Sequence, residues 1–293
     1  MKPSGAFFPV IAFGSLLMGG MAIGFGGILM RWSDVNPVAS AFWRMTLAVP
    51  ILWTWAAAVR AQDEAKGKRT DFTCMLLRAG IFFAGDLGVW HLSLHYTTVS
   101  NATLLSNLAP IFVALWMWIV HKTRFARVFL LGMAVALVGV IFLIGPNAAL
   151  GGARPVGDGL ALSTAILYAA YQLTVKDARS QYATARLMAW SSTITAIALL
   201  PFALAMPGLF VPAHAAGWWP LLGLALVAQI GGQTVIAYAF AHLPAALSSI
   251  SLLIQPLTAT IAAWLLLQEG ISPLQVLGGL LLILGIYLSK RGG

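Results

Sequence analysis

Several polar side chains stand alone within long apolar stretches of the sequence, and their chemistry suits the binding of a small molecule. Asp86 could attract an ammonium group or take up a proton, and a charged group in such surroundings is costly enough to be a functional candidate. Trp90 and His91 follow about one helical turn later, Trp90 forming either a cavity wall or an outer surface. His91 and His95 would share a helix face, but no Glu or Cys accompanies them at ligand spacing, so neither a metal nor another cofactor is expected.

Uncharged hydrogen-bonding side chains complete the candidate set. Gln229 and Gln233 are four residues apart and would share a helix face. Amides, phenols and an indole around a cavity would suit a zwitterion with an apolar side chain. The further candidates for substrate binding are Asn107, Tyr168, Tyr171, Gln172 and Gln255.

Arg44 gives Asp86 a second interpretation, as a structural partner. Arg44 is the only Lys or Arg well inside an apolar stretch. Counted inward from the same surface, the two residues differ in depth by roughly 4–5 Å at 1.5 Å per helical residue, which is within the reach of an arginine. Structural pairing and a direct role of Asp86 with substrate or proton both remain open.

The elements that must position these residues are membrane-spanning helices. The chain has 293 residues, of which 60% are hydrophobic and 9% charged, whereas soluble domains have about 25% charged residues. Residues 187–268 contain no Asp, Glu, Lys or Arg, and about 20 apolar residues cross a bilayer core. The runs do not alternate as the strands of a membrane barrel do. An all-α membrane protein is therefore predicted.

Ten transmembrane helices are predicted, and the basic residues orient them. The expected spans are 7–30, 37–59, 76–96, 99–120, 128–145, 157–175, 186–206, 218–240, 245–267 and 273–289. With the N-terminus inside, the outer loops hold only Arg31 and Arg154, whereas thirteen basic residues lie inside: Lys2, Arg60, Lys66, Lys68, Arg69, Lys122, Arg124, Arg127, Lys176, Arg179, Arg186, Lys290 and Arg291. This imbalance predicts that both termini are cytoplasmic. Membrane topology also explains the net charge of +9, so no nucleic-acid partner is expected. The short loops favour a bacterial inner membrane.

The sequence repeats itself at half its length. Each half, residues 1–148 and 149–293, would contain five spans, so the halves would run in opposite directions through the membrane. Inverted repeats with a site at their interface recur in secondary transporters, and matching helix breaks mark that site. Proline breaks a helix because it lacks a backbone N–H, and prolines are among four identities at an offset of 146 residues: Pro110 with Pro256, Trp118 with Trp264, Gly132 with Gly278 and Gly139 with Gly285.

Three segments resemble the drug/metabolite transporter superfamily, in its EamA-like branch. They are NPVASAFWRMTLAVPIL (36–52), YTTVSNATLLSNLAPIFVALW (96–116) and ALSSISLLIQPLTATIAAWLLLQEGISPLQVLGGLLLILGIYL (246–288). The resemblance extends over nearly the whole chain. It implies ten helices in two inverted five-helix repeats, with a central cavity lined mainly by helices 1, 3, 4, 6, 8 and 9. Within the superfamily, the chain is similar to YddG-type exporters of aromatic and other amino acids.

Transport of a small molecule is the function that these features predict. Export of a neutral amino acid with an aromatic or other apolar side chain fits the uncharged candidates, and the alternatives are lipophilic cations, drugs or sugar-type metabolites. The absence of a Walker motif argues against an ATP-driven pump. The hydrolase motifs Gly-x-Ser-x-Gly and His-Glu-x-x-His do not occur either, so an enzyme is not expected. The expected partners are the substrate and the lipid bilayer, with the protein acting as a monomer.

Overall fold

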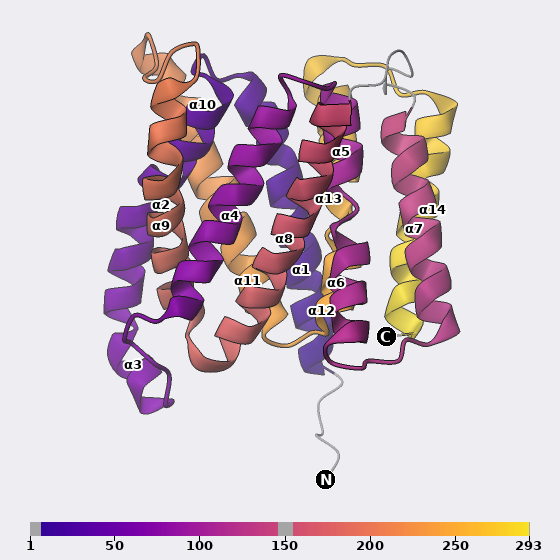
Figure 1. Cartoon of the computed structure of the whole chain (residues 1–293), viewed down its shortest axis with the longest axis horizontal. Helices are drawn as coiled ribbons and strands as arrows, with labels where there is room; N and C mark the ends of the chain where they lie inside the picture. The colour runs from indigo at the N-terminus through magenta and orange to yellow at the C-terminus, as the bar shows by residue number, and fades with distance from the viewer. Residues whose placement is uncertain (1–6, 146–154, 293) are drawn as a thin grey trace.

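The computed structural model describes residues 7–145 and 155–292, and its long helices run side by side (Figure 1). In the first half, the continuous helices are α1 (Phe7–Arg31), α2 (Pro37–Ala58), α4 (Cys74–Ser93) and α7 (Arg127–Ile144). A short helix, α3 (Arg60–Ala65), lies in the loop after α2. The second half contains α8 (Pro155–Gln181), α9 (Thr184–Ala205) and α14 (Pro273–Gly292). The predicted boundary between residues 148 and 149 lies outside the described residues.

Three further segments are composite. The predicted span 99–120 consists of α5 (Val99–Ser106) and α6 (Ala109–Ile119), and the span 245–267 consists of α12 (Ala245–Ser251) and α13 (Ile254–Leu267). The third composite segment starts with the 3-10 turn η2 (Ala215–Gly217) and continues through α10 (Trp218–Gly223), the π-helical segment η3 (Leu224–Gln233) and α11 (Thr234–Phe240). Such π-helical turns are rare and concentrate at functional sites.

Local sequence signals explain where several helices begin and end. Asn36 accepts a hydrogen bond from the amide of Ala39 at 2.8 Å and caps α2, whose first residue is Pro37. Thr98 caps α5 in the same way, accepting from the amide of Asn101 at 3.1 Å. The helix α13 ends where Gln268 adopts a left-handed conformation with φ of 58°.

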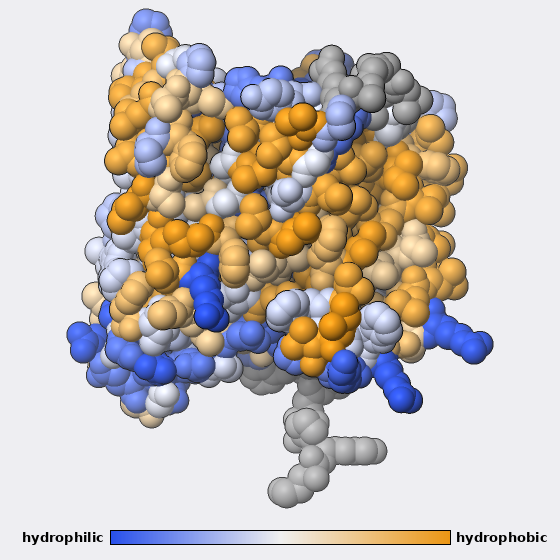
Figure 2. Space-filling view, viewed as in Figure 1, coloured by the Kyte–Doolittle hydropathy of each residue, from blue (hydrophilic) through white to orange (hydrophobic). Residues whose placement is uncertain are grey.

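The protein is a multi-pass membrane protein. Eight segments among the described residues are long and apolar enough to cross a bilayer: 10–31, 74–93, 99–119, 127–144, 184–205, 215–240, 245–267 and 273–292. Figure 2 shows that apolar side chains dominate the middle of the visible face, while hydrophilic ones gather towards its two ends. The long helices α2 and α8 are not among the eight.

The helices pack in two copies of one pattern, which establishes a two-repeat architecture. Helix α4 packs on α8 and α9, as the corresponding segment η3 packs on α1 and α2. Similarly, α5 and α6 contact α8, as α12 and α13 contact α1. Two further pairs, α2 with α9 and α7 with α14, join equivalent helices of the two halves. The contacts that hold the bundle together are therefore largely contacts between the halves.

Glycines let α7 and α14 approach backbone to backbone at one side of the bundle (Figure 1). A Cβ atom added at Gly139 would lie 2.5 Å from the backbone nitrogen of Leu282, and one added at Gly278 would lie 2.6 Å from that of Leu143. Gly132 and Gly285 face each other in the same way. These are the four glycines that match at the offset of 146 residues, so the repeat signal reflects a helix crossing that only small residues permit.

Candidate functional site

A cavity of about 560 Å³ lies between the two halves of the chain. Its walls come from α1, α2, α4, α5, α8, η3 and α13, with smaller contributions from neighbouring turns and α14. Pockets of this size accommodate a small organic molecule. Seven of the residues predicted to bind substrate line it: Asp86, Trp90, His91, Asn107, Tyr168, Gln233 and Gln255.

Three predicted residues do not line the cavity. Tyr171 lies one layer behind the wall, because its ring stacks on that of the lining residue Phe83 with a centroid separation of 4.5 Å. Gln172 is buried away from the cavity. Gln229 is fully buried and donates through Nε2 to Ser192 Oγ at 2.9 Å. These residues can act on a substrate only by positioning the side chains in front of them.

Arg44 lines the cavity but does not form the expected ion pair with Asp86. No ion pair within 4.0 Å joins the two among the residues that the structure describes. Instead, Arg44 Nε donates to Gln229 Oε1 at 3.2 Å, across to the second half of the chain. The depth counted from the sequence predicted that both side chains lie at a similar level in the membrane. It does not predict how each helix is rotated about its axis, and so it does not predict whether the two side chains face each other.

His91 lines the cavity with its imidazole ring held in one orientation. Its Nδ1 lies 2.6 Å from the carbonyl oxygen of Leu87, so Nδ1 carries the proton of the neutral ring and Nε2 has the lone pair. Nε2 is buried and has no hydrogen-bond partner. The indole of Trp90 lies edge-on to the imidazole at 4.9 Å between ring centroids and also lines the cavity.

The interruptions in the two composite helices bring amide side chains to the cavity wall. Asn107 ends α5, and its Nδ2 donates to the carbonyl oxygen of Thr103 at 2.7 Å. Gln255 lies in the first turn of α13 and donates to Tyr168 Oη at 3.3 Å. Pro110 and Pro256, the predicted breaks, lie just inside the helices that follow the interruptions, where a missing N–H costs nothing.

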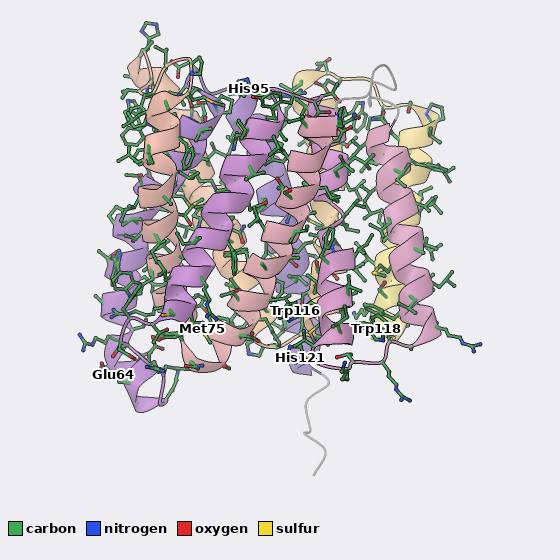
Figure 3. All side chains as sticks on the ribbon, in the orientation of Figure 1. Glu64, Met75, His95, Trp116, Trp118 and His121 are labelled. Atoms are coloured by element: carbon green, nitrogen blue, oxygen red, sulfur yellow. The ribbon has the colours of Figure 1, made fainter. Side chains whose placement is uncertain are left out.

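The cavity extends to one end of the molecule. Its outermost lining residues include Arg31 and Glu269, which form an exposed ion pair there, and Leu94 next to His95. Figure 3 shows His95 at this end, opposite to the end that carries Glu64 and His121. The sequence had not marked Arg31 or Glu269 as lining residues, because charged residues at span ends are ordinary interface residues.

Long basic side chains form hydrogen bonds at the other end of the bundle. Lys176 Nζ donates to the carbonyl oxygen of Leu243 at 2.9 Å, and Arg179 Nε donates to that of Ala237 at 3.2 Å. Both bonds tie the end of α8 to α11 and the turn after it.

No group of three or more His, Cys, Asp and Glu side chains able to hold a metal ion occurs among residues 7–145 and 155–292.

Comparison with known proteins relates this architecture to transporters. The family model described as "EamA-like transporter family" matches residues 10–145 and again residues 155–291. An uncharacterized transporter of Archaeoglobus fulgidus is 27% identical over 262 residues, which cover 87% of this chain and 88% of that protein. A solved crystal structure has the same fold, with a TM-score of 0.79 over 96% of both chains at 14% identity.

Two further relatives have names that mention a substrate. A protein of Streptantibioticus cattleyicolor named "Probable terminal-alkyne amino-acid exporter" is 28% identical over 198 residues, covering 67% of this chain and 65% of that protein. The pseudopaline exporter CntI of Pseudomonas aeruginosa is 21% identical over 217 residues, covering 74% and 75%.

Proposed function

Because this chain belongs to the EamA-like transporter family, we propose that it exports a neutral amino acid with a large apolar side chain through the central cavity. Transport rather than catalysis is supported by the family match over both halves and by relatives named as transporters or exporters. One relative is named as an exporter of an amino acid. The cavity wall itself carries the argument for the substrate class.

The formal charges that line the cavity balance. The charged lining residues are Arg31, Arg44, Asp86 and Glu269, two of each sign. An anionic substrate such as a nucleotide sugar would need several cationic partners, and Arg44 is the one deep cation. A zwitterion needs only one group of each sign, with Asp86 facing its ammonium group.

The aromatic and amide side chains suit the remainder of such a substrate. Trp90, Tyr168 and Phe83 offer ring faces and edges to an apolar side chain, each contact contributing about 0.5–1.5 kcal/mol. His91 and Gln233 add hydrogen-bonding atoms without a charge requirement. Several weak contacts of this kind favour a broad range of aromatic and other apolar amino acids.

Ten spans, rather than eight, complete the proposed architecture. Helix α2 has 22 residues and α8 has 27, so each is at least about 33 Å long at 1.5 Å per residue. Residues 159–175 of α8 carry no charge, and α8 is surrounded by α4, α5, α6, α11 and α12. A helix enclosed by other helices does not need an apolar surface all round. With α2 and α8 included, the two halves divided at residues 148 and 149 contain five spans each and run in opposite directions.

Both termini then lie in the cytoplasm of a bacterium, with the protein as a monomer in its inner membrane. The excess of basic residues in the loops at the end with Glu64 and His121 supports this orientation (Figure 3). The cavity, which reaches the end with His95, accordingly opens to the outside. We therefore propose that the structure corresponds to an outward-open state of an alternating-access cycle.

Export from living cells tests this function. Expression in a bacterial host that lacks its own exporters of aromatic amino acids should lower intracellular phenylalanine and confer resistance to toxic phenylalanine analogues. Resistance to lipophilic cations without resistance to these analogues would instead favour the drug-exporter alternative, in which Asp86 acts as the receptor for a cation.

A further inference from the structure

Arg44 is held in the cavity wall by one neutral partner. Its Nε donates to Gln229 Oε1 at 3.2 Å, and Gln229 is fixed in turn by donating to Ser192 Oγ at 2.9 Å. Gln229 and Ser192 are both fully buried. The amide therefore orients the guanidinium group firmly, but it does not neutralise its charge.

One terminal nitrogen of the guanidinium group lacks an acceptor. Nη2 of Arg44 is buried and has no hydrogen-bond partner, and none of the ion pairs found among the described residues includes Arg44. The guanidinium carbon lies 6.0 Å from the ring centroid of Phe83, which also lines the cavity. Buried donors of this kind are almost always satisfied, and a charged donor is the most costly to leave unpaired.

We infer that Arg44 is the receptor for the α-carboxylate of the transported amino acid, so that a free carboxylate is required for binding. The planar guanidinium fork matches a carboxylate in geometry and charge better than any neutral group does. A bound carboxylate would satisfy the unpaired Nη2 and supply the ion-pair partner that the neutral Gln229 does not provide. This inference rests on the proposed function, and it separates Arg44 from Asp86, which faces the ammonium group.

Competition for binding tests the requirement for a carboxylate. Purified protein in lipid nanodiscs would bind radiolabelled phenylalanine, and unlabelled phenylalanine and phenylalaninamide would compete at about pH 6, where α-amino groups are charged. We expect the amide to bind at least about tenfold more weakly than phenylalanine, because a hydrogen bond to a charged group is lost. If the amide binds within about twofold of phenylalanine, the inference is wrong while the export of amino acids stands.

Variants distinguish a carboxylate receptor from a structural brace. Arg44→Gln should weaken the binding of phenylalanine by about ten- to a hundredfold and leave that of the amide almost unchanged, and Arg44→Lys should keep part of the preference. Arg60→Gln, which removes an exposed arginine of α3, is the matched control and should leave both affinities unchanged. Equal losses for both ligands in Arg44→Gln would show that Arg44 only braces α2 against η3.

Gln229→Glu keeps the inference testable if Arg44 variants fail to fold. Glutamate has the same shape as glutamine, and its carboxylate would form an ion pair with Arg44 within the protein. Arg44 would then no longer be available to the carboxylate of the substrate. Phenylalanine should then lose its advantage over the amide, and persistence of the full preference would overturn the inference. If phenylalanine does not bind to the wild-type protein at all, the proposed substrate class fails, and the inference fails with it.

Discussion

At the scale of residues, His91 and Gln233 bring uncharged hydrogen-bonding groups to the cavity from the two halves of the chain. His91 is held by Leu87 with its Nε2 unpartnered, and Gln233 lies at the end of the π-helical segment η3. Among the residues that the structure describes, neither side chain forms a hydrogen bond to another helix. Their replacement should therefore affect the substrate more than the fold.

We predict that His91→Ala and Gln233→Ala each weaken the binding of phenylalanine by about two- to tenfold, the effect of one lost neutral hydrogen bond. The resistance to toxic analogues should fall in parallel, while immunoblots show an unchanged amount of protein in the membrane. His121→Ala and Gln62→Ala are matched controls, because both side chains are exposed at the opposite end of the molecule. Equal effects in the controls would remove the two residues from the proposed site.

Asp86→Asn tests the other charged contact of the substrate. We predict a loss of at least about tenfold in the affinity for phenylalanine, because its ammonium group loses a charged partner. The affinity for 3-phenylpropionate, which has no amino group, should not fall. A loss of the same size for both compounds would assign Asp86 to the structure rather than to the ammonium group.

The sequence indicated which residue types would surround the site, but not which way each one points. Tyr168 and Tyr171 are three residues apart on α8, a helix packed on several sides, so no apolar stripe reveals its rotation; only Tyr168 reaches the cavity. Gln229 and Gln233 were expected on one face of an α-helix. The π-helical turn of η3 has a different period, and Gln229 turns to Arg44 and Ser192 instead.

At the scale of elements, the composite helices show what a local sequence pattern can and cannot specify. Matching prolines in the two halves pointed to matching interruptions, and both helices are interrupted in the structure. The interruptions precede Pro110 and Pro256, because proline is well tolerated in the first turn of the helix that follows. The amide side chains that reach the cavity, Asn107 and Gln255, come from these positions.

The crossing of α7 and α14 yields a stability prediction. Gly285→Ala should lower the free energy of unfolding by about 1–3 kcal/mol, since the added methyl group would meet the backbone of Ala136 and Gly132. Gly159→Ala on α8 is the matched control: no atom lies within 4 Å of its added Cβ, and alanine should be neutral or stabilise the helix by up to about 1 kcal/mol. Thermal unfolding of both variants in detergent would measure the difference. Equal melting temperatures would mean that the helices do not cross this closely.

At the scale of the whole molecule, the orientation of the chain in the membrane determines the side to which the cavity opens. Lys176 and Arg179 tie α8 to α11 and the turn after it at one end, whereas the cavity reaches the end with His95. Composition and charge-free runs predicted the membrane helices, and half-length identities predicted the repeat. The shape and opening of the cavity depend on how helices distant in sequence pack, which no local pattern contains.

We predict that both termini are cytoplasmic. A reporter enzyme that is active only in the cytoplasm should be active when fused to the C-terminus, and a reporter that is active only in the periplasm should not. Fusions in the loop near His95 should give the opposite result. A periplasmic C-terminus together with a cytoplasmic N-terminus would mean an odd number of spans. It would remove both the inverted repeat and the interpretation of the cavity as open to the outside.

Counterflow in proteoliposomes tests the central claim most directly. Vesicles containing the purified protein would be loaded with unlabelled phenylalanine and diluted into a trace of labelled phenylalanine. The account predicts transient accumulation of label above that in protein-free vesicles, suppressed by external tryptophan or tyrosine and reduced in Gln233→Ala. If phenylalanine neither moves nor competes with any compound that the protein does transport, the amino acid assignment is contradicted, although membership of the transporter family stands.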